Sequence, residues 1–416
     1  MLVIRDTRES GEMLQAAAAA GISEAGADAL LGGVLPTPAA PLLMRRYGLD
    51  LGVVISASHN PYYDNGIKFF GADGFKLSDE LEDEIESALR AEGGALAEEG
   101  GAPGAGGGRS GPDGHPEIGA VRVLHGTEED YLRELETRFK GLDLSGLDVA
   151  LDCANGATYR VAPEIFRRLG AKVTVMADTP DGRNINAGCG STHLQTLTER
   201  LVDGGHHVGF AFDGDGDRVL AVDGAGQVVD GDELMALIAL HMRHSGRLGD
   251  GGVAVTVMTN YGFHAAMREA EVPVATTSVG DRYVLQELRA RGWLLGGEQS
   301  GHIVDLSFNS SGDGVACALL ALEALGDRPL SDRGAMEKLP QRLVNVRVRD
   351  REALAQAAAV QEAVRAEDRS LEGRGRVLVR PSGTEPLVRV MVEAPSDEEA
   401  EAVCERLVAL VERELG

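Results

Sequence analysis

The first segment whose residue types could do chemistry is Ile55–Pro61, with the sequence ISASHNP. An apolar run leads into it, and a proline and a glycine keep the backbone that follows irregular. Ser58 stands beside His59, and Lys68, one of only five lysines in the chain, follows ten residues later. This pattern favours a hydroxyl nucleophile or phosphoacceptor assisted by a cation. From spacing alone, an ordinary Ser/Asn turn is the alternative.

The second segment is Asp213–Arg218, with the sequence DGDGDR, directly after the apolar run Val208–Phe212. Alternate residues of an extended loop project to one side, so the three carboxylates can converge. Clustered carboxylates repel one another unless a cation neutralises them, and oxygen ligands favour Mg²⁺ or Ca²⁺. An EF-hand is a poor fit, because its sixth and twelfth positions would be Arg218 and Gly224. The alternative is a solvated acidic turn.

The third segment is Gly296–His302, with the sequence GGEQSGH. Glu298, Ser300 and His302 alternate, so their side chains can share one face. Carboxylate and hydroxyl groups suit the hydroxyls of a sugar, and a histidine can exchange a proton near neutral pH. A glycine-rich turn with a hydrogen-bonded histidine explains the segment equally well.

The fourth segment is Arg380–Pro386, with the sequence RPSGTEP, followed by Arg389. Two arginines, the hydroxyls of Ser382 and Thr384 and the backbone N–H groups near Gly383 could cradle a phosphate dianion. The prolines restrict the loop and favour a preformed site. The alternative is a turn with exposed arginines.

Together the four segments offer a nucleophile, a metal site, a sugar contact and a phosphate cradle. Phosphoryl transfer requires mainly positioning and charge neutralisation from a protein, and these parts supply both. The chain has no Walker-type loop, which excludes a P-loop kinase. A phosphatase that uses Asp213 would leave the serine and sugar segments without a role.

Composition limits the possible partners and location. The formal net charge is −26, with a sequence pI near 4.8, which argues against binding to nucleic acid or to an anionic membrane. The four cysteines form no Cys-x-x-Cys pair, which suits a reducing cytosol. No secretory signal and no run of about 18 apolar residues is found, so we expect a cytoplasmic protein.

The pattern of apolar residues predicts the strands and helices that position these segments. The expected strands are Val53–Ile55, Val149–Leu151, Val173–Met176, Val208–Phe212, Val253–Met258 and Val377–Val379. The expected helices are Glu128–Phe139, Ala162–Leu169, Leu194–Val202 and Glu233–His241. This alternation predicts repeated β-α units with mainly parallel sheets, followed by a C-terminal α+β segment that reads strand, helix, strand, loop, strand, helix.

Composition also predicts the domain boundaries. Residues 91–119 are rich in glycine and are expected to form a flexible surface excursion. Breaks near residues 141, 231 and 340 divide the chain into four domains. We predict domain I at 1–140, domain II at 141–231, domain III at 232–340 and domain IV at 341–416.

With these residues in view, the chain resembles the α-D-phosphohexomutase superfamily almost from end to end. The further segments that match the family are Arg5–Arg8, Asp152–Ala157, Asn184–Thr192 and Gly280–Val284. The resemblance implies three related α/β domains with mixed, mainly parallel sheets and a C-terminal α+β domain around a central cleft. Family members begin with a further strand and a loop that contributes an arginine, which this chain is expected to lack.

The resemblance also implies roles for individual residues. Ser58 would be a phosphoserine and, with Asp213, Asp215 and Asp217, would hold one Mg²⁺ per chain. Catalysis would use Ser58, Lys68, Arg218 and His302. Substrate would contact His59, Glu298, Ser300, Arg380, Ser382, Gly383, Thr384 and Arg389.

The implied activity is that of an isomerase that interconverts glucosamine 6-phosphate and glucosamine 1-phosphate through glucosamine 1,6-bisphosphate. It would feed UDP-N-acetylglucosamine synthesis, and hence peptidoglycan, in a monomer or homodimer whose partner is a small phosphosugar. Two alternatives stay open. One is a mutase for glucose or mannose phosphates, and the other is an inactive sugar-phosphate-binding relative without the N-terminal loop.

Overall fold

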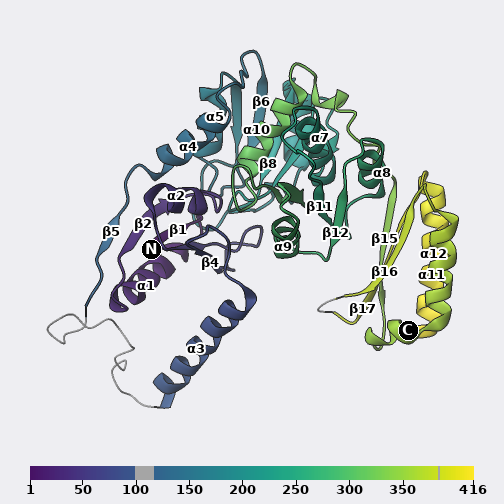
Figure 1. The fold of residues 1–416 in the computed structure, drawn as a ribbon, viewed down its shortest axis with the longest axis horizontal. Coiled ribbons are helices and arrows are strands. Elements are labelled where there is room, and N and C mark those ends of the chain that lie inside the picture. Colours follow the sequence, from purple (N-terminus) through teal and green to yellow (C-terminus); the bar gives the residue numbers. More distant parts are fainter. Residues whose placement is uncertain (99–116, 383–384) are drawn as a thin grey trace. The chain divides into compact units, whose positions relative to one another are not determined.

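The computed structural model describes residues 1–98, 117–382 and 385–416 (Figure 1). These residues form two compact units. The larger unit contains residues 1–256 and 275–333, and the smaller unit contains residues 257–274 and 334–416. None of the helices in the described ranges combines the length and apolarity needed to span a membrane.

The first sheet of the larger unit has the strand order β4-β3-β1-β2-β5. Its strands are β1 (Leu2–Arg5), β2 (Ala29–Val34), β3 (Leu51–Ile55), β4 (Ile67–Gly71) and β5 (Val121–Val123). Its helices are α1 (Gly11–Glu24), α2 (Ala39–Tyr47), α3 (Asp79–Glu98) and α4 (Thr127–Arg138). The apolar strand β1 is central and runs parallel to β2 and β3, whereas β4 is antiparallel to β3. The loop after β3 therefore leaves the sheet at its carboxyl edge, where α/β proteins build sites.

The second sheet has the strand order β10-β9-β8-β6-β7. Its strands are β6 (Asp148–Asp152), β7 (Lys172–Met176), β8 (Val208–Phe212), β9 (Val219–Asp223) and β10 (Val228–Val229), with helices α5 (Val161–Arg168) and α6 (Gln195–Gly204). Strand β6 is parallel to β7 and β8, and β8 is antiparallel to β9. All five residues of β8 are buried, which explains why this strand is continuously apolar.

The third sheet has the strand order β12-β11-β13-β14. Its strands are β11 (Val253–Thr256), β12 (Val274–Thr277), β13 (Leu295–Gly297) and β14 (Ile303–Asp305), with helices α7 (Gly231–His244), α9 (Asp281–Arg291) and α10 (Gly314–Leu325). Strands β13 and β14 pair antiparallel, so the segment between them, residues 298–302, is a hairpin turn. Helix α10 is capped by Asp313, whose side chain accepts the N–H of Ala316.

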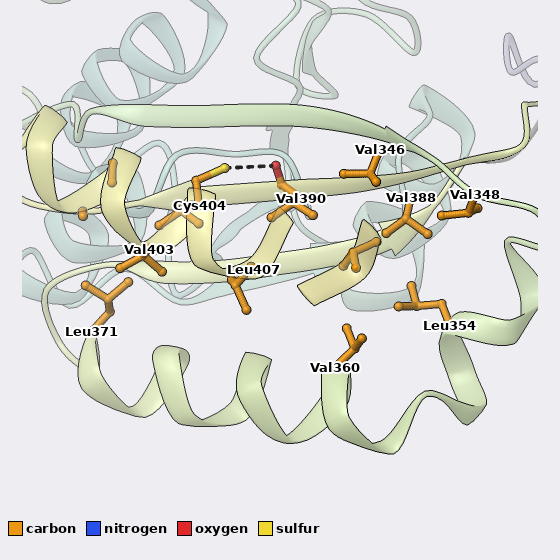
Figure 2. Packing of buried hydrophobic residues seen from close by; sticks show 14 residues of the cluster. Val346, Val348, Leu354, Val360, Leu371, Val388, Val390, Val403, Cys404 and Leu407 are labelled. Carbon is orange, nitrogen blue, oxygen red and sulfur yellow. Dashed lines mark hydrogen bonds between the residues drawn. The ribbon is translucent and has the colours of Figure 1, made fainter. Parts of the chain in front are cut away.

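The smaller unit is built on the antiparallel sheet β15-β17-β16. Its elements are α8 (Tyr261–Glu269), β15 (Gln341–Arg347), the 3₁₀ turn η2 (Glu352–Gln356), α11 (Ala358–Ser370), β16 (Arg376–Pro381), β17 (Leu387–Glu393) and α12 (Asp397–Leu415). Figure 2 shows Val388 and Val390 of β17 directed toward Leu407 of α12 and Val360 of α11, and all four side chains are buried. One face of this sheet thus carries the core.

Two expectations about the elements are wrong. The strand expected at Val253–Met258 ends at Thr256, because Asn260 accepts the N–H of Gly262 and begins α8, so the residues between form the connecting turn. The excursion expected at 91–119 begins later, since α3 continues to Glu98 on a sequence rich in Ala, Leu and Glu. Residues 99–116 lie outside the described part of the chain. The other expected strands and helices lie within the observed ones, with small differences at their ends.

Candidate active site

Ser58 lies three residues beyond the end of β3 and faces the aspartates of the second sheet. Its Oγ donates a hydrogen bond of 2.6 Å to Asp213 Oδ2 and lies 3.3 Å from His59 Nδ1. Its φ of 52° is in the left-handed region, which is uncommon for a residue with a side chain. The first two sequence segments, 155 residues apart, therefore meet at one hydroxyl.

The three aspartates follow β8 and lie together. Ligand oxygens of Asp213, Asp215 and Asp217 all lie within 4.8 Å of one another, and all three side chains are buried. Gly216 has a φ of +71°, which lets the loop turn so that the carboxylates converge. One oxygen each of Asp215 and Asp217 is buried without a hydrogen-bond partner in the described part of the chain. Unsatisfied carboxylate oxygens in one cluster fit a hard cation.

The pKa values of the clustered carboxyl groups also indicate a site suited to a cation. Burial, together with Asp217 and Asp215, raises the pKa of Asp213 well above its usual range. Burial also opposes ionisation of Asp215, but Lys68 and Thr37 outweigh it and lower the pKa of that carboxyl. A bound cation would offset the repulsion that raises the pKa of Asp213.

Cationic groups surround the cluster. Lys68, on β4, donates to Asp215 Oδ2 at 2.6 Å and lies 3.6 Å from Asp217 Oδ2. Burial lowers the pKa of Lys68, but the two carboxylates raise it further, so this lysine is charged. Arg218 Nη1 lies 3.2 Å from His59 Nδ1. Burial and then Arg218 lower the pKa of His59, which keeps this imidazole neutral at pH 7.

The hairpin between β13 and β14 brings the third segment to the same unit. Its buried His302 has Nε2 3.9 Å from Asp217 Oδ2 and 3.9 Å from Asp281 Oδ2. Glu298 Oε1 accepts the N–H of Gly280 at 3.0 Å, which orients this carboxylate. Ser300 is exposed. The side chains expected to contact a sugar therefore border the aspartate cluster through His302.

The fourth segment lies in the smaller unit. Arg380 on β16 and Arg389 on β17 are direct cross-strand partners. Burial, and then the like charge of Arg389, lowers the pKa of Arg380, and Arg389 Nε is buried without a partner among the described residues. Ser382 is buried, and its carbonyl accepts a hydrogen bond from Arg351. Two adjacent guanidinium groups are suited to bind an anion. Gly383 and Thr384 lie outside the described residues.

Several residues that shape the site were given no role from the sequence. Thr37 Oγ1 donates to Asp215 Oδ2 at 2.6 Å, and Lys76 forms an ion pair with Asp281. Arg8 and Asn186 bind the backbone around Ser58. Arg8, Asn186 and Asp281 do lie in segments that match the family, and this was the available signal. Their types alone indicate no chemistry.

Comparison with known proteins agrees with this geometry. Four family models match in order, described as phosphoglucomutase/phosphomannomutase α/β/α domain I (residues 1–94), domain II (129–226), domain III (230–342) and C-terminal domain (343–410). The chain is 51% identical over 414 residues to a phosphoglucosamine mutase of Desulforudis audaxviator, which covers 99% of this chain and 89% of the relative. The chain belongs to the phosphoglucomutase/phosphomannomutase family. The resemblance and the fold class predicted from the sequence are thereby confirmed.

Other members of the phosphoglucomutase/phosphomannomutase family extend the comparison. A phosphoglucosamine mutase of Moorella thermoacetica is 51% identical over 97% of this chain and 88% of its own length. A solved family protein from Burkholderia thailandensis has a TM-score of 0.77 and 22% identity, over 99% of this chain and 89% of its own. An N-acetylphosphoglucosamine mutase of Aspergillus fumigatus, solved with GlcNAc-6P and magnesium, has a TM-score of 0.66 and 20% identity, over 91% of each chain. These structures show the shared fold.

Proposed function

We propose that this chain interconverts glucosamine 6-phosphate and glucosamine 1-phosphate through a phosphorylated Ser58. The observation that carries the proposal is the contact between Ser58 Oγ and Asp213 at 2.6 Å, inside a buried cluster of three carboxylates. A serine hydroxyl beside a cation site is suited to accept a phosphoryl group, because the cation can neutralise the charge of that group. Phosphoglucosamine mutases about 50% identical over nearly the whole chain support the amino sugar as substrate.

The reaction exchanges one P–O bond for another. The bond from phosphorus to Ser58 Oγ breaks, a bond to O1 of glucosamine 6-phosphate forms, and the hydroxyl proton of O1 ends on Ser58 Oγ. The resulting glucosamine 1,6-bisphosphate reverses its orientation in the site, so that O6 faces Ser58. Ser58 then takes the phosphoryl group from O6, and glucosamine 1-phosphate leaves. We assign to Lys68 and Arg218 the positive charge beside the transferred group, and to Lys68 a part in moving the proton; Lys68 binds Asp215 and Arg218 lies beside His59.

The metal proposed for this site is Mg²⁺. Asp213, Asp215 and Asp217 would hold it, and the unsatisfied oxygens of Asp215 and Asp217 fit an ion that prefers oxygen ligands. When bound, Mg²⁺ neutralises charge on the phosphoryl group. We further assign Glu298, Ser300 and His302 to the sugar, and the arginine pair of Arg380 and Arg389, with Ser382, Gly383 and Thr384, to the phosphate that is not reacting.

The state of the cysteines bears on the compartment in which the enzyme works. The four cysteines are free and buried, which suits a reducing cytosol. We propose a cytoplasmic monomer or homodimer whose partner is a small phosphosugar, with a product that supplies UDP-N-acetylglucosamine synthesis.

Relative turnover of three substrates tests the proposed activity. The purified protein, primed with catalytic glucose 1,6-bisphosphate, is assayed with Mg²⁺ on glucosamine 6-phosphate, glucose 6-phosphate and mannose 6-phosphate. We expect the highest kcat/KM for glucosamine 6-phosphate. A higher value for either hexose phosphate would assign the chain to a hexose phosphate mutase. Binding without turnover of any of the three would identify an inactive relative.

A further inference from the structure

The Arg8 side chain is fully buried beneath the loop that carries Ser58. Its five N–H donors meet five acceptors. One acceptor is Asp6 Oδ2, bound by Nε at 2.8 Å. The other four are the backbone carbonyls of Ser58, Asn60, Pro61 and Asp64. Four of the five guanidinium donors therefore bind the backbone of one loop, and none is left unpaired.

The carbonyl of Ser58 is held from two directions. Arg8 Nη2 donates to it at 3.0 Å, and Asn186 Nδ2, from the loop before α6, donates to it at 2.9 Å. Both groups also bind the carbonyl of Asn60, at 2.8 Å and 3.1 Å. We call Arg8 and Asn186 the carbonyl clamp. It joins the first sheet of the larger unit to the second at the residue that faces the aspartates.

The backbone of Ser58 needs such support. A non-glycine residue in the left-handed region costs of order 1–3 kcal/mol and persists only where its surroundings hold it. Ser58 has a φ of 52°, and its N–H donates to Ser56 Oγ at 3.0 Å. Ser56 in turn donates to Asp6 Oδ2 at 2.6 Å. The amide and the carbonyl of Ser58 are therefore fixed through one network that contains Arg8 and Asp6.

We propose that the carbonyl clamp positions Ser58 for phosphoryl transfer, with Arg8 as its principal member. It holds the backbone of residues 58–64, so that Ser58 Oγ stays directed at the aspartates, without itself touching the sugar phosphate. This inference rests on the proposed function, because it assumes that Ser58 carries the transferred group. A lysine at position 8 keeps the charge but cannot supply five donors in a planar fork.

The test compares Arg8→Lys and Asn186→Ala with the unchanged protein. The control is Arg333→Lys, since Arg333 is a partly buried guanidinium of the larger unit that binds a carboxylate, Glu233, at 2.6 Å. Each protein is loaded with glucose 1,6-bisphosphate and mixed with glucosamine 6-phosphate. Single-turnover loss of phosphate from Ser58 is followed by mass spectrometry, and steady-state kcat and KM are measured below the unfolding temperature of each variant.

We expect Arg8→Lys to slow transfer about 100-fold, because displacements near 1 Å cost about that much. Asn186→Ala should slow it about 3- to 10-fold, and KM should change less than twofold in both, because both side chains are buried beneath the loop. Arg333→Lys should transfer at the unchanged rate. Equal rates in Arg8→Lys and the unchanged protein, or a change in KM alone, would overturn the proposal.

Three further outcomes distinguish the remaining interpretations. If Arg8→Lys does not fold, Asn186→Ala decides, and an unchanged transfer rate in that variant overturns the clamp. If the unchanged protein carries no phosphate and shows no turnover, the proposed function itself fails. Lower unfolding temperatures with unchanged transfer in both variants would assign the clamp to stability alone.

Discussion

Ser58 has a rigidly held backbone and a hydroxyl in a strongly charged environment. Its backbone is fixed by buried donors and acceptors, whereas its hydroxyl points at three carboxylates that repel one another. Because Lys68 and Thr37 both bind Asp215, the pKa of that carboxyl is lowered, whereas burial and the neighbouring carboxylates raise the pKa of Asp213 well above its usual range. We therefore expect a metal ion bound by these aspartates to affect the reactivity of the serine hydroxyl that contacts Asp213.

We predict that Asp215→Asn weakens Mg²⁺ binding more than about tenfold, because even residues that only orient metal ligands have effects of that size. Turnover at saturating sugar phosphate should fall as well, since Lys68 loses the nearer of its two carboxylate partners. The measurement is turnover as a function of Mg²⁺ concentration, with calorimetric titration of the metal. Asp143→Asn, at a loop position distant in sequence from the cluster, is the control. Unchanged affinity in Asp215→Asn would remove this residue from the metal site.

At the scale of elements, the site depends on two loops that touch. The loops after β3 and β8 meet at Gly214, where an added Cβ would lie 2.6 Å from the carbonyl oxygen of Ser58 and 2.8 Å from Asn186 Nδ2. Each loop begins at the carboxyl end of a buried strand, so the sheets fix both starting points. The close approach requires a glycine.

We predict that Gly214→Ala lowers kcat about 100-fold or more while the protein remains folded, because the added carbon pushes Ser58 away from the aspartates. The control is Gly141→Ala, where an added Cβ meets no atom within 4 Å. Circular dichroism and kcat are compared for both variants. Near-normal turnover in folded Gly214→Ala would show that the two loops are free to separate.

The sequence predicts elements better than it predicts contacts. The sequence predicts β6, β8 and the acidic loop after β8, because apolar residues indicate burial and acidic residues indicate charge. Arg8 and Thr37 were missed, since all of their side-chain partners in the site except Asp6 lie 50 to 178 residues away and include backbone carbonyls, which no residue pattern reveals. The helical start of the glycine-rich segment was missed because helix formers outweighed two glycines.

At the scale of the whole molecule, the chain divides into two compact units with separate cores. The four family domains match in order along the chain. We propose boundaries near residues 140, 231 and 340 between them. The smaller unit contains a partly buried histidine, His264 on α8, whose pKa is lowered to about 4 by burial and by the charges of Arg376 and Arg268.

This histidine makes the stability of the smaller unit depend on pH. Between pH 6.5 and about 4 the unfolded chain binds a proton that folded His264 does not, so stability is lost as the pH falls through this range, by at most about 3 kcal/mol. We predict that His264→Gln reduces this loss in urea unfolding at pH 7 and pH 5. The exposed His244→Gln is the control. Equal pH dependence in His264→Gln and the unchanged protein would contradict the assignment.

The most direct measurement is the intact mass of the purified protein before and after addition of excess glucosamine 6-phosphate. We predict that the chain gains one phosphoryl group from glucose 1,6-bisphosphate, gives it up to the sugar phosphate, and that Ser58→Ala folds but neither gains the group nor turns over. Phosphorylation of Ser58→Ala to the same extent, or near-normal turnover in that variant, would contradict the central claim that Ser58 carries the transferred group.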